Sequence, residues 1–154
     1  MPDPGEMING AMQAGYRFMS VRPRSKQEVR RRLKRSFEPH IVEQALTRLE
    51  GQGYLDDTAF ARLWRESREA HRPRSAALMV RELVEKGVSR EVAQEAVKDL
   101  DDKANAYRAA QRRLRSLQGL DYVAFRRSLA GYLGRRGFSP TVINCTMARC
   151  RKSS

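Results

Sequence analysis

The chain has 154 residues, and its 31 Lys and Arg against 18 Asp and Glu give a formal net charge of +13. Such an imbalance favours an anionic partner, with nucleic acid as the first candidate, over solubility alone, which charge of either sign would provide. The opening residues lack the apolar run of an export signal, and no stretch approaches the roughly 20 apolar residues that span a membrane. We therefore expect a cytoplasmic protein that does not contact membranes.

The tetrapeptide Arg-Pro-Arg-Ser occurs twice, at residues 22–25 and 72–75. When the two sites are placed in register, a set of apolar positions aligns, and a third copy follows without the tetrapeptide. The aligned positions are Val29, Leu33, Phe37, Ile41, Ala45 and Leu49, then Met79, Leu83, Val88, Val92, Ala96 and Leu100, then Leu129, Leu133, Phe138, Val142, Thr146 and Cys150. A period near 50 residues is typical of stacked repeats.

In chain order, each repeat is expected to contain three helices, with apolar residues four apart on the second and third. The first repeat has helices near 7–19 and 25–35 and a third that begins after Glu38. The second has helices near 58–70, after Ser75 and after Ser89. The third has helices near 104–117, after Asp121 and after Ser139. The residues expected at the N-cap positions of these helices are Ser25, Glu38, Ser75, Ser89, Asp121 and Ser139.

The predicted fold is therefore all-α, a tandem array of three three-helix repeats, elongated and curved. We expect the first repeat with a short N-terminal tail over residues 1–52, the second over 53–102, and the third with a basic C-terminal tail over 103–154. Positive charge lies toward the two ends: residues 22–48 hold nine basic and three acidic residues, residues 76–102 hold four and seven, and residues 103–154 hold twelve and one.

The segment GYLDDTAFA, residues 53–61, lies between the first two repeats. Together with RPRSKQEVRRRLKR before it and RPRSAALMVRELVEKGV after it, this segment resembles the RecX family of bacterial regulators of the RecA recombinase. The resemblance extends from about Ala11 to Arg149. It implies a helical-repeat protein that binds in the groove of the RecA–single-stranded DNA filament and suppresses its ATPase and strand-exchange activities. A role in recombination, DNA repair and the SOS response would follow.

Two departures from the family pattern affect local turns. Ser36 stands where the family usually has glycine, and the first repeat is one residue shorter there. The third repeat begins its middle helix with GLDYVAF in place of Arg-Pro-Arg-Ser.

Arginines and lysines are the candidate partner-binding and nucleic-acid-binding residues. The run RRRLKR at 30–35 surrounds one apolar residue with five cations, which a single buried stripe cannot cover. A solvated helix face is the alternative interpretation of each basic run, and a purely structural role is the alternative for the repeated tetrapeptide. The candidate set is Arg22, Arg24, Arg30, Arg31, Lys34, Arg35, Arg72, Arg74, Arg108, Arg112, Arg115, Arg126, Arg127, Arg135 and Arg136. Of these, Arg108, Arg112 and Arg115 are expected to form a stripe on one helix face.

Asp56 and Asp57 are adjacent carboxylates, but no further ligand or base accompanies them as catalysis or metal binding would need. We expect Asp57 to cap the following helix and Asp56 to place charge near its positive end. Gly53, Tyr54, Leu55 and Phe60 complete, with the two aspartates, an expected structural motif between repeats. Trp64 and Cys150 are expected in the core, with Cys145 partly exposed, and His40 and His71 lack companion metal ligands.

No motif predicts a nucleophile, a phosphate-binding glycine loop or a zinc site, so neither an enzyme nor a cofactor is expected. The leading hypothesis is a monomer that binds the RecA filament and single-stranded DNA, with duplex DNA bound weakly. A stand-alone basic helical module that binds DNA is the alternative. A third possibility is a helical scaffold for some other acidic protein.

Overall fold

The computed structural model describes residues 2–153, with side chains described through Arg151, and that part of the chain contains nine α-helices, one 3₁₀ turn and no strand. The elements are α1 Pro4–Val21, α2 Lys26–Lys34, α3 Pro39–Gly51, α4 Asp57–His71, α5 Ala76–Glu85, α6 Arg90–Val97, α7 Asp102–Leu114, the 3₁₀ turn η1 Arg115–Leu117, α8 Tyr122–Arg135 and α9 Pro140–Ser153. The all-α prediction and the grouping of helices in threes are confirmed.

The helices begin largely where the sequence predicts. The Ser25 hydroxyl accepts the Glu28 N–H at 3.1 Å, and the Glu28 carboxylate accepts the Ser25 N–H at 3.0 Å, so α2 starts with a complete capping box. The Ser75 hydroxyl accepts one N–H at the start of α5, and Asp121 does the same for α8. Glu38 differs from the expectation, because its side chain makes no capping hydrogen bond and Pro39 alone marks the start of α3.

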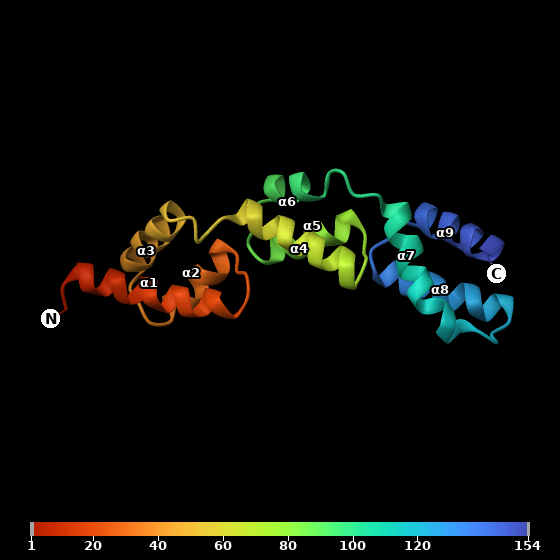
Figure 1. Ribbon diagram of the computed structural model, residues 1–154, viewed down its shortest axis with the longest axis horizontal. Helices are drawn as coiled ribbons and strands as arrows, with labels where there is room; N and C mark the ends of the chain where they lie inside the picture. The colour runs from red at the N-terminus through yellow and green to blue at the C-terminus, as the bar shows by residue number, and fades with distance from the viewer. Residues whose placement is uncertain (1, 154) are drawn as a thin grey trace. The chain divides into compact units, whose positions relative to one another are not determined.

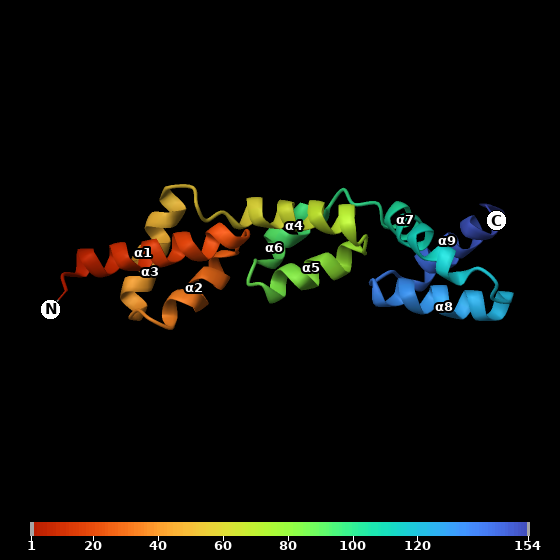
Figure 2. The same cartoon turned by 60° about the horizontal axis from the view of Figure 1, so that its bottom comes forward.

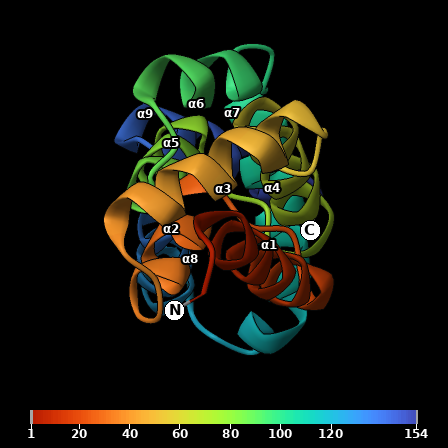
Figure 3. The same cartoon turned by 90° about the vertical axis from the view of Figure 1, so that its left-hand side faces the viewer.

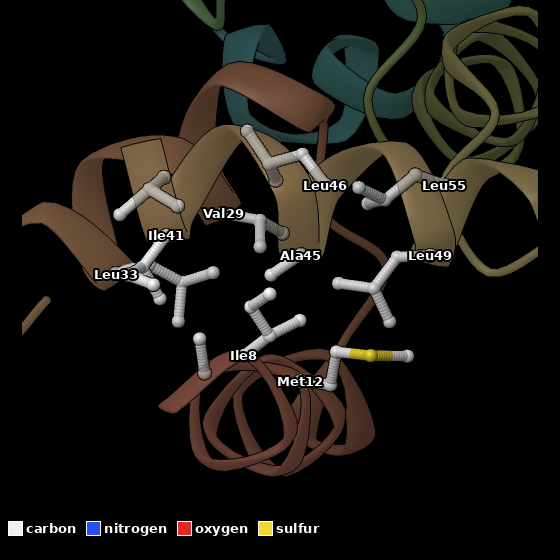
Figure 4. Packing of buried hydrophobic residues seen from close by; sticks show 11 residues of the cluster. Ile8, Met12, Val29, Leu33, Ile41, Ala45, Leu46, Leu49 and Leu55 are labelled. Carbon is white, nitrogen blue, oxygen red and sulfur yellow. The ribbon is translucent and has the colours of Figure 1, made fainter. Parts of the chain in front are cut away.

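The core of the first repeat lies between α1, α2 and α3 (Figure 4). Ile8 of α1 points toward Val29 of α2 and Ala45 of α3, and Met12 of α1 lies beside Leu49 of α3. The buried face of α3 contains more residues than the predicted set spaced four apart. Ile41, Ala45 and Leu49 are buried as predicted, and their neighbours Val42 and Leu46 are buried as well. The end-on view shows α3 passing across α1 (Figure 3). Each fully buried leucine or isoleucine contributes roughly 1.5–3 kcal/mol, so these contacts hold the three helices together.

The core of the third repeat is built on small residues of α7. Ala106, Ala109 and Ala110 are fully buried, and they pack in one cluster with Leu129 and Leu133 of α8. Phe138, Met147 and Cys150 complete the cluster, and α7, α8 and α9 lie together in Figures 1 and 2. Burial raises the pKa of the Cys150 thiol, whereas Cys145 is exposed. The predicted burial of Cys150 is confirmed.

Contacts divide the chain into two compact units that do not follow the repeats. One unit contains Met1–Arg62 with Leu83–Ala93, and the other contains Leu63–Glu82 with Gln94–Ser154. The second repeat is thus shared between them, because different parts of it are bonded to the first and to the third repeat, as described below. The repeat limits 1–52, 53–102 and 103–154 stay a prediction from the sequence.

Candidate anion-binding surface

The first joint between repeats forms at the start of α2. The Ser25 hydroxyl donates to the Lys86 carbonyl at 2.5 Å, and the Lys26 N–H donates to the Asp57 carboxylate at 2.9 Å. Gly87 follows Lys86 with φ +91, and a Cβ there would lie only 2.2 Å from the Cβ of Gln27. Only glycine therefore allows the turn after α5 to approach the start of α2 this closely.

A second joint repeats this geometry at the start of α5. The Ala76 N–H donates to the Asp102 carboxylate at 2.9 Å, and the Ser75 N–H donates to the Arg136 carbonyl at 3.0 Å. Gly137 has φ +88, and a Cβ there would lie 2.4 Å from the Ser75 hydroxyl. The serine of each Arg-Pro-Arg-Ser segment is thus a connection to the following repeat as well as a helix cap.

The adjacent aspartates have roles that differ from the expected ones. Asp56 caps α4 by accepting the Ala59 N–H at 3.1 Å, so the prediction that Asp57 is the cap is wrong. Asp57 is the first residue of the helix, and its carboxylate is engaged in the first joint. The pair Asp101 and Asp102 divides the two roles in the same way at α7. Sequence reasoning missed this second pair, although Leu-Asp-Asp is spelled at both 55–57 and 100–102.

The other residues of the expected inter-repeat motif differ in burial. Leu55 and Phe60 are buried, whereas Tyr54 is 60% exposed. The Tyr54 ring packs edge-on against Tyr16 with 4.9 Å between ring centroids. Gly53 has φ +83 and lies in the turn that follows α3. Within this motif, Leu55 and Phe60 therefore provide most of the buried apolar surface.

The arginines of the first Arg-Pro-Arg-Ser segment are partly engaged inside the protein. Arg22 forms a salt bridge with Glu28 at 2.9 Å. Partial burial disfavours the charged Glu28 carboxylate, but hydrogen bonds from Ser25 and Arg22 outweigh it, so the pKa of Glu28 lies below its usual value. Arg24 stacks its guanidinium 3.9 Å from the Phe18 ring centroid.

In the second Arg-Pro-Arg-Ser segment, Arg74 is buried and forms a salt bridge with Glu82 at 2.5 Å. Burial, together with nearby arginines, lowers the pKa of Arg74 from its usual value. The Trp64 indole, which is half-buried rather than part of the core, also donates to Glu82. Arg72, by contrast, is exposed at the surface.

Toward the end of α2, one face carries cations that form no salt bridge or side-chain hydrogen bond within the described residues. Arg30 is held by Glu43 through two hydrogen bonds of 2.9 and 3.0 Å, and this pairing lowers the pKa of Glu43. Arg31 and Lys34 of α2 and Arg35, the C-cap residue of α2, lie at spacings of three and four and are exposed. Among the described residues, no carboxylate lies within 4 Å of any of these three. We call them the α2 basic face.

The arginines expected to form a stripe on α7 do not act alike. Arg108 lies 3.5 Å from the Glu69 carboxylate, and Arg112 donates to the carbonyls of the last two residues of α4. Arg112 therefore satisfies the C-terminus of α4, where a cation is favourable. Arg115 belongs to η1, because α7 ends at Leu114, so the expectation that one helix carries all three is wrong.

The arginines of α8 and the turn after it divide in the same manner. Arg126 donates to the Asn144 side chain at 3.3 Å, and Arg136 lies 5.1 Å from the centroid of an aromatic ring on the same helix. Arg127 and Arg135 are exposed, and neither forms an ion pair within the part of the chain that the structure describes. Arg115 shares both properties, so these three are the predicted binding residues of the third repeat that stay exposed and unpaired by salt bridges.

Other site types find no support in the described residues. No group of three His, Cys, Asp or Glu side chains in residues 2–151 is placed to hold a metal ion. Over the described helices, none is long and apolar enough to cross a membrane.

Comparison with known proteins identifies the architecture. Three family models match the chain. They are described as "RecX, first three-helix domain", "RecX, second three-helix domain" and "RecX, third three-helix domain", and they match residues 11–49, 56–97 and 101–147, respectively. The regulatory protein RecX of Pelodictyon phaeoclathratiforme is 33% identical over 84% of this chain and 81% of its own length. That of Streptomyces coelicolor is 34% identical over 88% of this chain and 74% of its own.

Among solved structures, RecX from Lactobacillus salivarius superposes with a TM-score of 0.80 over 94% of this chain and 97% of that one. Their sequence identity is 15%, so this likeness concerns the fold. The sequence matches, which follow the three repeats in order, show that the chain belongs to the RecX family of regulatory proteins.

Proposed function

We propose that this protein regulates homologous recombination and DNA repair by binding in the groove of the RecA–single-stranded DNA filament. There it inhibits ATP hydrolysis and strand exchange, acting as a monomer. The observation that carries this proposal is the match of the three RecX domains, in order, to the three repeats. Groove occupancy would hinder nucleotide turnover and the entry of a second duplex.

The cations without internal partners are the best candidates for the contact. Among the residues predicted to bind, those that are exposed and form no salt bridge or side-chain hydrogen bond within the described residues are Arg31, Lys34, Arg35, Arg72, Arg115, Arg127 and Arg135. An anionic partner offsets the repulsion between like charges on one helix face. Arg22, Arg24, Arg30, Arg74, Arg108 and Arg112, which were also expected to bind, have internal contacts that they would have to exchange for the partner. Arg126 and Arg136 have internal contacts too, but only with a neutral side chain and an aromatic ring, respectively.

The single-strand-dependent ATPase of RecA tests the proposal. Adding rising amounts of the folded protein should lower the rate of ATP hydrolysis until it reaches a plateau. An unchanged rate at saturating protein, with helical structure verified by circular dichroism, would contradict the proposal.

A charge reversal sharpens the assignment of the surface. Replacing Arg31, Lys34 and Arg35 by Glu should weaken inhibition, because the α2 basic face would then repel the filament. The matched control replaces Arg62, Arg81 and Arg90, which are exposed cations outside the candidate set, and should change inhibition less. Equal loss in both variants would indicate that net charge, and not this face, governs binding.

A stand-alone DNA-binding module is the second candidate, and the unpaired cations favour it as well. Neutralising Z phosphates of a single strand gives a log–log salt slope of roughly −0.7Z, against about −0.9Z for duplex. Titration of fluorescent oligothymidylate and of duplex DNA without RecA separates the two candidates. Tight duplex binding together with an unaltered RecA ATPase would favour the module.

A further inference from the structure

The first and second repeats place different residues at two equivalent positions of their first two helices. In the 50-residue register of the Arg-Pro-Arg-Ser segments, Ala14 on α1 corresponds to Trp64 on α4. Arg32 on α2 likewise corresponds to Glu82 on α5. The first repeat therefore lacks both a large aromatic side chain and a carboxylate that the second repeat has.

In the second repeat these two side chains act together. The Trp64 Nε1–H donates to one Glu82 oxygen at 3.2 Å, and the other oxygen binds the buried Arg74 at 2.5 Å. Arg68 stacks 4.2 Å from the indole ring. The aromatic ring thus provides a stacking surface, while the carboxylate neutralises a buried guanidinium.

In the first repeat the corresponding guanidinium has no such partner. Arg24, the counterpart of Arg74, lies 3.9 Å from the Phe18 centroid, and Arg32 lies 5.9 Å from the same centroid. Within the described residues, no carboxylate is within 4 Å of either arginine. Partial burial and the nearby charge of Arg22 lower the pKa of Arg24 by more than the charge of Glu28 raises it.

An open groove of about 510 Å³ is lined by Arg32 and by Phe18, the residue whose ring Arg24 also contacts. Ala14, Phe18, Leu33 and Phe37 give it an apolar lining, and Arg17 and Arg32 give it positive charge. No acidic residue lines it. Its volume is within the range of sites that hold small organic groups, roughly 300–1,000 Å³.

We propose that this α1/α2 groove binds a bulky apolar side chain flanked by carboxylates on a partner protein. The apolar side chain would take the place that the small Ala14 leaves open, and the carboxylates would meet Arg24 and Arg32. The partner would thereby supply to the first repeat what Trp64 and Glu82 supply within the second. This inference does not depend on RecA being the partner.

The probe is the capped peptide Glu-Glu-Trp-Glu-Glu, titrated into the isotope-labelled full chain. The methyl signals of Val21 and Leu33, which border the groove, should shift in a saturable manner. The peptides Glu-Glu-Ala-Glu-Glu and Lys-Lys-Trp-Lys-Lys should bind at least about tenfold more weakly, because each lacks one of the two features. Equal binding of all three peptides would overturn the proposal.

Variants that rebuild the second repeat's arrangement provide the decisive control. Ala14→Trp with Arg32→Glu should abolish the peptide-induced shifts, whereas Arg62→Glu, away from the groove, should preserve them. If the double variant does not fold, Arg32→Glu alone should lower the affinity for the acidic peptide at least about tenfold relative to the affinity for the basic peptide. Unchanged peptide affinity in Arg32→Glu, or shifts of Val21 and Leu33 produced by oligothymidylate and not by the acidic peptide, would contradict the proposal.

Discussion

The two joints use equivalent serines, Ser25 and Ser75, in different ways. At the first joint the Ser25 N–H is occupied by the Glu28 carboxylate, and the Ser25 hydroxyl reaches the Lys86 carbonyl. At the second joint the residue three positions after the serine is Leu78, which has no acceptor, and the Ser75 N–H itself donates to the Arg136 carbonyl. The residue at that third position therefore decides which atom of the serine connects one repeat to the next.

Both joints share the close approach of a glycine with positive φ, and its loss should have the largest effect. Gly87→Ala and Gly137→Ala should each lower the free energy of unfolding by about 3 kcal/mol or more. A left-handed residue with a Cβ costs roughly 1–2 kcal/mol, and the contacts at 2.2 and 2.4 Å add overpacking. Urea denaturation measures the loss.

Gly119 is the matched control for these substitutions. It has φ +86, but a Cβ there would meet nothing within 4 Å. Gly119→Ala should therefore cost only the conformational term, about 1–2 kcal/mol. Equal losses at Gly87, Gly137 and Gly119 would mean that close packing at the joints contributes nothing.

The serine comparison should give the next largest effect. Ser25→Ala removes a helix cap and the hydroxyl bond to Lys86, so about 2 kcal/mol of stability should be lost. Ser75→Ala removes the cap but keeps the backbone bond to Arg136, and should cost about 1 kcal/mol. Thermal denaturation of both variants under one buffer condition measures the difference. A larger loss at Ser75 than at Ser25 would reverse the proposed division of roles.

Replacement of Glu28 should have a smaller, pH-dependent effect. Its pKa is lowered in the folded protein, so its charge stabilises the fold above the unfolded value of about 4.3, and this contribution disappears as the pH falls through the folded pKa. Glu28→Gln should cost about 1 kcal/mol at pH 7 and progressively less below pH of about 4. Melting temperatures of the two proteins between pH 7 and 3 provide the test, and a constant difference would exclude the charge as the cause.

Local sequence signals predicted the repeats well, because capping and apolar spacing act over a few residues. Ser25, Asp121 and Pro39 mark helix starts in the structure as expected. The alignment of the repeats was less informative after α6, because this helix ends at Val97 and does not include Leu100. Leu100 is only partly buried, whereas Leu49, the residue aligned with it, is buried. Leu100 is instead the first residue of the second Leu-Asp-Asp sequence and corresponds to Leu55.

The division of the arginines into engaged and available groups did not follow from the sequence. Arg112 caps a helix about 40 residues earlier in the chain, and Arg24 and Arg68 stack on aromatic rings. Helical periodicity shows which residues share a face, but it does not show which carbonyl or ring from another helix covers that face. Such long-range contacts require the tertiary structure.

Amide hydrogen exchange tests the joints most directly. The N–H groups of Lys26 and Ala76, each the first residue of its helix, should exchange slowly because Asp57 and Asp102 accept them, although such groups usually lack a partner. The Tyr122 N–H holds the same position in α8, has no hydrogen-bond acceptor among the described residues, and should exchange rapidly. Asp57→Ala should accelerate exchange at Lys26 but not at Ala76. Exchange at Lys26 and Ala76 as fast as at Tyr122 would contradict the connection of each repeat to the next through these bonds.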